Sequence, residues 1–167
     1  MDIVTPKHTD ILLFALIVDP ADLQPTVGTD LAPDIDLHRG ENPLVFRSIS
    51  SGNSGYTLGN GANAAAGSNF VNRSDGGLIF VTIQHRLGGY GFLSSDAIEE
   101  DGAPNAGLLD VRVATEWVQR NIRAFGGDPS KITIRGDSAG GGAVANQLTM
   151  YGGQPSPPSR VAIAESL

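Results

Sequence analysis

The hydrophobic pattern divides the chain near residue 44. Before that point there is one apolar run, Ile11–Val18, which predicts a buried strand. The Pro- and Asp-rich stretch from Asp19 to Pro43 has no sustained period and predicts a loop. We therefore expect a poorly patterned N-terminal segment with one strand at residues 1–43, and a single patterned unit at residues 44–167.

Short apolar runs in the second part predict strands. Leu44–Ile49 is the first, and Leu78–Ile83 is so continuously apolar that it suits a strand buried on both faces. Lys131–Arg135 and Val161–Ala164 are shorter runs of the same kind. A turn-rich loop, Gly52–Gly61, follows the first of these strands.

Helices are predicted between the strands. One apolar stripe has the spacing of a helix face and ends at Gly126-Gly127. Its members are Ala114, Trp117, Val118, Ile122 and Phe125. A later helix has Val144, Gln147, Leu148 and Tyr151 on one face, and a short helix is predicted over Ala62–Val71. Strands separated by helices indicate a parallel sheet of the doubly wound α/β class, with any chemistry at the carboxyl ends of the strands.

Composition and charge narrow the possible functions. The 167 residues are 40% hydrophobic and 17% charged, which is typical of a globular domain. The net charge of −7, without a basic patch, argues against nucleic acid or an anionic membrane as a partner. There is no Cys, and no carboxylate pair or His cluster has metal-ligand spacing, so we expect no disulfide, metal or cofactor. Ile11–Val18 is too short for a transmembrane segment and lacks the charged flank of a signal peptide.

The strongest chemical signal is Gly136-Asp137-Ser138-Ala139-Gly140, which matches Gly-x-Ser-x-Gly between a predicted strand and a predicted helix. A serine on such a sharp turn projects its hydroxyl clear of the sheet, and the helix behind it offers free N–H groups to a developing oxyanion. Small residues let strand and helix approach, a task that Gly136 and the run Gly140–Gly142 can perform. The alternative is a plain Gly-rich turn that holds phosphate, although neither common phosphate-loop pattern is present.

Four longer segments occur in one order around this pentapeptide. Together they resemble the type-B carboxylesterase, cholinesterase and fungal lipase family over roughly residues 44 to 167. The segments are Asn105–Asp110, Trp117–Ile122, Phe125–Pro129 and Gly136–Gly141. The resemblance implies a partial α/β-hydrolase fold, a mainly parallel sheet flanked by helices and truncated at both ends.

The resemblance also implies an activity and a site. The activity would be hydrolysis of small-molecule or lipid carboxylic esters through an acyl-enzyme, with Ser138 as nucleophile and the N–H of Ala139 as an oxyanion donor. The family places its other donors in a Gly-Gly-Gly-aromatic loop, where this chain has Asn53-Ser54-Gly55-Tyr56. Ser54 and Gly55 are therefore candidate donors, since each has a backbone N–H. Two of the three glycines are replaced, which can change the angles of the loop.

The other members of a catalytic triad are not evident. In this fold the chain order is serine, acid, histidine, yet Glu165 is the only carboxylate side chain after Ser138, and all three histidines precede it. His85, at the end of a predicted strand, is a candidate base, but a packing variant of an aromatic position is the favoured interpretation. Two functions stay open: an ester hydrolase that needs a complementing C-terminal segment, and a non-catalytic binding or adhesion relative on the same fold.

Overall fold

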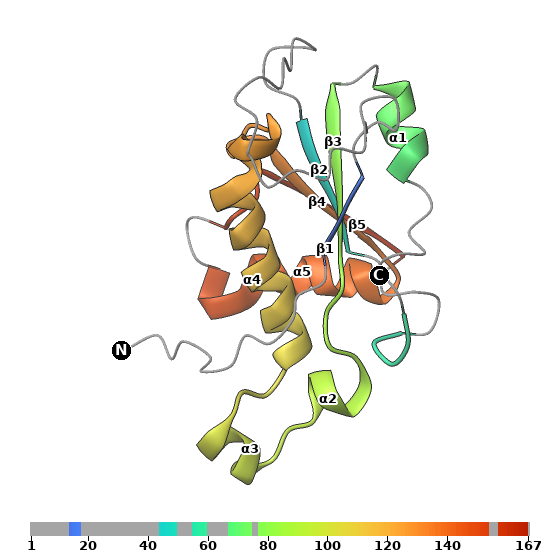
Figure 1. The fold of residues 1–167 in the computed structure, drawn as a ribbon. Coiled ribbons are helices and arrows are strands. Elements are labelled where there is room, and N and C mark those ends of the chain that lie inside the picture. Colours follow the sequence, from blue (N-terminus) through green and yellow to red (C-terminus); the bar gives the residue numbers. More distant parts are fainter. Residues whose placement is uncertain are drawn as a thin grey trace, which may run out of the picture.

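A computed structural model describes residues 14–17, 44–49, 55–59, 67–74, 77–153 and 157–166 (Figure 1). Its strands are β1 (Phe14–Ile17), β2 (Leu44–Ile49), β3 (Leu78–Ile83), β4 (Ile132–Asp137) and β5 (Val161–Glu165). Its helices are α1 (Gly67–Arg73), α2 (Gly88–Phe92), α3 (Asp96–Asp101), α4 (Ala106–Asn121), the 3₁₀ turn Ile122–Phe125, and α5 (Ala139–Gly153).

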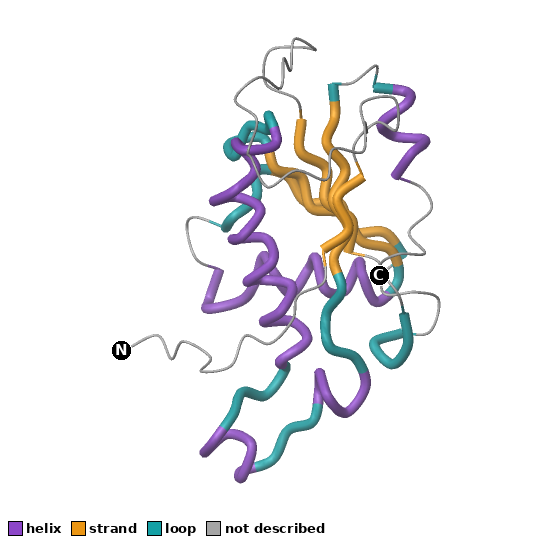
Figure 2. Tube along the Cα trace, viewed as in Figure 1, coloured by secondary structure: helices purple, strands orange, loops and turns teal. Residues whose placement is uncertain are grey.

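The strands form one sheet in the order β1-β3-β2-β4-β5 (Figure 2). β1 is antiparallel to β3, and the other neighbours are parallel. In the sheet, β3 lies on one side of β2 and β4 lies on the other, so the connections β2–β3 and β3–β4 run in opposite directions across the sheet. Because parallel connections are right-handed, this reversal places α1 on one face of the sheet and α4 and α5 on the other. The predicted mainly parallel sheet flanked by helices is confirmed.

Side-chain alternation along β3 explains the two layers. Ile79, Val81 and Ile83 belong to the main core, with residues of α4, β4 and α5. Phe80 points to the opposite face and packs with Val71 of α1. The strand is therefore buried on both sides, as its unbroken apolar run predicts.

The first long helix differs from its predicted stripe at both ends. It begins at Ala106, well before the predicted residues, and α2 and α3 precede it without having been predicted. At the other end the chain tightens into a 3₁₀ turn, which rotates Phe125 out of the buried stripe and leaves it 40% exposed. Gly126 then takes a left-handed φ of 80° and ends the turn, at the predicted position.

The predicted face of the second helix is only half correct. Val144 and Gln147 are buried, but Leu148 and Tyr151 are 47% and 58% exposed. Helical geometry fails from Met150 onward, so Tyr151 no longer follows the helical phase. Leu148 lies within the regular part and is exposed all the same, because no described element covers it.

The remaining predictions fall partly outside the described residues. β1 occupies Phe14–Ile17 of the predicted Ile11–Val18 strand, and the loop from Asp19 to Pro43 lies wholly outside. The short helix predicted over Ala62–Val71 is described only as α1, Gly67–Arg73. Within the described ranges, no helix has the length and apolarity needed to span a bilayer, and no three potential metal ligands cluster.

Candidate active site

Ser138 is the single residue between the end of β4 and the start of α5, at the tip of a sharp turn. Its φ is 54°, in the left-handed region that non-glycine residues rarely adopt. Its amide donates to the carbonyl of Glu165 at 3.0 Å, and its own carbonyl accepts from the amide of Gly142 at 3.0 Å. These two bonds fix the turn between β5 and the first turn of α5, while Ser138 itself stays exposed.

Three glycines around the elbow each face a different neighbour. A Cβ on Gly136 would overlap the backbone of Gly140, and one on Gly141 would overlap the carbonyl oxygen of Glu165. A Cβ on Gly142 would lie 2.6 Å from the hydroxyl of Tyr56. Of these three glycines, Gly136 is the one that serves the strand–helix approach that the sequence predicts. The absence of a side chain at Gly141 lets the end of β5 lie close to α5, and its absence at Gly142 makes room for the Tyr56 hydroxyl.

The candidate oxyanion donors come from two segments. Ala139 is the first residue of α5, where backbone N–H groups have no partner within the helix. Gly55 lies in the described turn Gly55–Gly59 with a φ of 65°, and Ser54 lies outside the described residues. The hydroxyl of Tyr56 reaches Gly142, so Gly55, its neighbour in sequence, lies on the same side of the sheet as the elbow.

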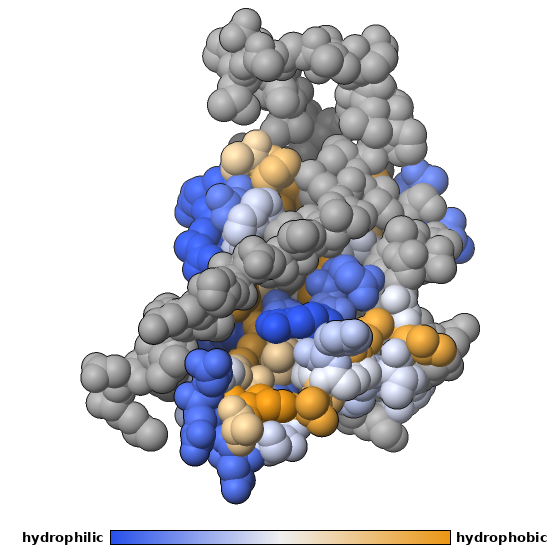
Figure 3. Space-filling view, turned by 60° about the horizontal axis from the view of Figure 1, so that its bottom comes forward, coloured by the Kyte–Doolittle hydropathy of each residue, from blue (hydrophilic) through white to orange (hydrophobic). Residues whose placement is uncertain are grey.

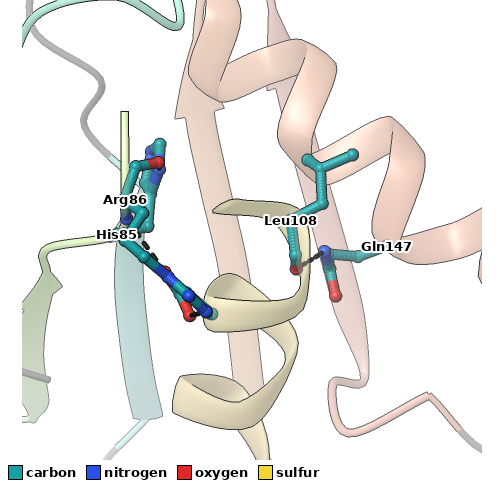
Figure 4. A network of polar contacts seen from close by, with 5 residues as sticks. His85, Arg86, Leu108 and Gln147 are labelled. Atoms are coloured by element: carbon teal, nitrogen blue, oxygen red, sulfur yellow. Dashed lines mark hydrogen bonds and ion pairs between the residues drawn. The ribbon is translucent and has the colours of Figure 1, made fainter. Parts of the chain in front are cut away.

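His85 is buried where β3 ends (Figure 4) and is only 5% exposed. Its Nδ1 lies 2.9 Å from the carbonyl oxygen of Arg86. A carbonyl can only accept, so Nδ1 is the donor in this contact. Within the described part of the chain, Nε2 is buried without a hydrogen-bond partner. This enclosure favours the packing interpretation over a role as a base open to substrate.

Arg86, the residue after His85, links the end of β3 to α4 through hydrogen bonds. The Arg86 guanidinium donates to both carboxylate oxygens of Asp110, at 2.8 and 2.7 Å, and the Arg86 amide donates to the same carboxylate at 2.9 Å. The hydrogen bond to Asp110 raises the pKa of Arg86. Asp110 is thereby engaged in a structural ion pair. Figure 4 shows a second tie, in which Gln147 of α5 donates to the carbonyl of Leu108 at 3.1 Å.

Glu165 contributes to the site through its backbone, a role that the sequence did not reveal. Its carbonyl accepts from Ser138, and its carboxylate forms a two-pronged ion pair with Arg135, with one N–O distance of 2.8 Å. The hydrogen bond from Arg135 lowers the pKa of Glu165. A usable signal was the parallel pairing of the two strands, which brings their carboxyl ends to one edge of the sheet.

This ion pair predicts a dependence of stability on pH. A carboxyl group with a lower pKa in the folded than in the unfolded chain stabilises the fold above its ordinary value near 4.5, and loses that contribution as the pH falls through the folded value. We expect Glu165→Gln to lower the melting temperature more at pH 6 than at pH 3. The matched control is Glu100→Gln on α3, at an exposed position away from the elbow. An equal loss for Glu165→Gln at both pH values would contradict the assignment.

A mainly parallel sheet, with a strained serine on the turn between a strand and the following helix, defines an α/β-hydrolase. The chain belongs to the carboxylesterase family, whose sequence profile matches residues 48–156. It is 52% identical over 99 residues to the carboxylesterase patB of Penicillium expansum, and 55% identical over 76 residues to lipase 1 of Geotrichum candidum. These matches cover 58% and 46% of this chain.

A solved structure agrees with this assignment. The crystal structure of Aspergillus niger EstA matches 74% of this chain with a TM-score of 0.69 and 40% sequence identity. The chain corresponds to a small part of each of these proteins, namely 18% of the Penicillium carboxylesterase, 14% of the Geotrichum lipase and 23% of EstA.

Proposed function

We propose that this chain carries the nucleophile of a carboxylic ester hydrolase, with Ser138 attacking the ester carbonyl. The observation that carries the proposal is the φ of 54° at Ser138 on a strand–helix turn. Strained backbone of this kind costs about 1–3 kcal/mol and persists at sites where the strain serves a function. Glycine at this position would relieve the strain but would also remove the hydroxyl.

The chemistry follows from the groups around the serine. The Ser138 Oγ adds to the carbonyl carbon of the ester while its proton passes to a base, and the resulting oxyanion accepts hydrogen bonds from backbone N–H groups. Ala139 and Gly55 are the proposed donors among the described residues, and Ser54 is proposed beside them. Collapse of the tetrahedral intermediate releases the alcohol, and water then hydrolyses the acyl-serine. Small-molecule or lipid esters are the proposed substrates, since relatives of this chain are named carboxylesterases and lipases.

We further propose that the acid and the histidine of the triad come from a complementing segment. All three histidines precede Ser138, and the side chain of Glu165 is held by Arg135. Among the described strands, β5 pairs only with β4, so its other edge can accept a further strand. Val161 and Ile163 of β5 are exposed, which supports docking of apolar side chains along this strand.

The end of the sheet that carries the elbow also exposes apolar surface. Figure 3 brings forward the lower end of Figure 1, where α2 follows β3, and shows orange patches among polar side chains. Leu58, Tyr90 and Leu93 are 65%, 91% and 62% exposed. Apolar surface at this end of the sheet is suited to the complementing segment and to the apolar part of an ester.

The test is hydrolysis of p-nitrophenyl butyrate by the chain, with and without a polypeptide corresponding to the C-terminal remainder of the Penicillium carboxylesterase. We expect the chain alone to match Ser138→Ala, because serine without a base is a weak nucleophile. With the complementing polypeptide, we expect a rate at least about 10³-fold above that of Ser138→Ala.

The matched control is Ser94→Ala, which removes a hydroxyl from an exposed residue after α2 and should leave the complemented rate unchanged. If a complex forms and its rate equals that of Ser138→Ala, the nucleophile assignment is wrong. That outcome would favour the non-catalytic binding relative.

A further inference from the structure

Tyr56 joins two parts of the site that are distant in sequence. Its carbonyl accepts from the amide of Gly88 at 2.8 Å, which ties the Gly55–Gly59 turn to the start of α2. Its ring packs on Phe92 with centroids 4.8 Å apart and contacts the main core. The backbone and ring of Tyr56 are therefore held against α2, and its hydroxyl lies against α5.

The hydroxyl occupies a space that exists because residue 142 has no side chain. A Cβ at that position would lie 2.6 Å from the hydroxyl oxygen, closer than real Cβ contacts come. Gly142 is in the first turn of α5, and its amide donates to the Ser138 carbonyl. The tyrosine hydroxyl thus contacts the turn of helix that closes the elbow.

Asn146, one helical turn further on, completes the arrangement. Its side chain is hydrogen-bonded to the Tyr56 side chain. Its Nδ2 also donates to the carbonyl of Gly142 at 2.9 Å. The amide group is held from two directions, so it offers the tyrosine an oriented partner. Burial raises the pKa of Tyr56, so the hydroxyl keeps its proton at neutral pH.

We propose that Tyr56, Gly142 and Asn146 form a clamp that holds the Gly55 turn against the elbow, which makes Tyr56 a positioning residue for ester hydrolysis at Ser138. The functional part of this inference rests on the function proposed above. An oxyanion donor must lie about 2.7–3.1 Å from the developing charge, so a small shift of its loop weakens it.

The amide of Gly88 reports on the clamp directly, because its hydrogen bond to Tyr56 breaks when the turn lifts away. We expect Tyr56→Phe and Asn146→Ala each to accelerate hydrogen exchange at Gly88 about fivefold, the loss of one net hydrogen bond. The amide of Gly127, bonded to the Ile122 carbonyl at 2.9 Å in a different part of the chain, should exchange at its original rate. Leu58→Ala, which trims an exposed side chain of the same turn, is the matched control and should change neither amide.

A rescue distinguishes the clamp from general loosening. Gly142→Ala should accelerate exchange at Gly88 by about tenfold or more, because the new methyl group displaces the hydroxyl. Adding Tyr56→Phe to Gly142→Ala should slow that exchange again, although the same change accelerates it in the original chain. This reversal of sign is the coupling expected when the added methyl group and the tyrosine hydroxyl compete for one space.

The functional measurement uses the complemented enzyme. Tyr56→Phe should lower kcat about tenfold or more without raising KM, as expected for a loss confined to the transition state. Unchanged exchange at Gly88 in Tyr56→Phe, or no rescue in the double variant, would overturn the clamp. Changed exchange with kcat and KM unchanged would overturn the positioning role. If Ser138 gives no turnover at all, the proposed function fails and the positioning role with it, while the exchange data still decide whether the clamp exists.

Discussion

Gly136→Ala is expected to destabilise the chain by about 3 kcal/mol or more, the upper end of the cost of overpacking. The added methyl group would overlap the carbonyl of Gly140, which is backbone and cannot swing aside as a side chain can. Gly136 also pairs with Ile49 and Ala164 in the sheet, so the strand cannot retreat without breaking two ladders. Total stabilities of about 5–15 kcal/mol make this a large fraction of the whole.

Urea unfolding, followed by the fluorescence of Trp117, measures this effect, since Trp117 is the single tryptophan and packs against the main core. The matched control is Gly89→Ala on α2, where a Cβ meets no atom within 4 Å. We expect that change to be neutral, or stabilising by up to about 1 kcal/mol through helix propensity. Equal urea midpoints for the two variants would show that strand and helix do not approach as closely as described.

Sequence patterns predicted the central elements because buried positions are apolar and recur along the sequence in continuous runs or at regular spacings. Leu44–Ile49 and Leu78–Ile83 have the predicted bounds of β2 and β3. In β3 the reason is that a strand covered on both faces admits almost only apolar residues. The Gly-x-Ser-x-Gly pentapeptide likewise predicted a sharp strand–helix turn. Its residues are small, and it lies directly between a predicted strand and a predicted helix.

Other features of the fold cannot be read from the spacing of apolar residues. α2 is a five-residue helix containing three glycines, which no periodic pattern reveals. Leu148 and Tyr151 were predicted on a buried face because sequence shows which residues are apolar, but not whether a neighbour is present to cover them.

The clamp was beyond sequence reasoning for another reason. Gly142 directly follows Gly141, which packs against the backbone of Glu165, and the sequence pattern predicted the same role for both glycines. Gly142 instead faces a tyrosine 86 positions earlier in the chain (142 − 56), and only the fold brings the two together. Asn146 is an exposed polar residue on a helix, a type that usually has no specific partner. Long-range contacts between ordinary residues are therefore what the structure adds at this site.

Ser138→Gly is expected to raise stability and abolish ester hydrolysis in the complemented enzyme. A left-handed conformation costs a non-glycine residue about 1–2 kcal/mol, and glycine removes that cost. The greater freedom of glycine in the unfolded chain offsets about 0.4–1 kcal/mol of the gain. The net expectation is a free energy of unfolding about 0.5–1 kcal/mol above that of Ser138→Ala, or roughly 1–4 °C in melting temperature.

Comparison with Ser138→Ala isolates the backbone, because both variants lack the hydroxyl and only glycine relieves the strain. Asn105→Gly is the control at a second left-handed residue, with a φ of 57°. Asparagine tolerates this conformation better than serine, so its gain should be smaller. A glycine variant no more stable than the alanine variant would mean that Ser138 is not strained. The proposal that strain is kept there for the sake of a nucleophile would then lose its physical basis.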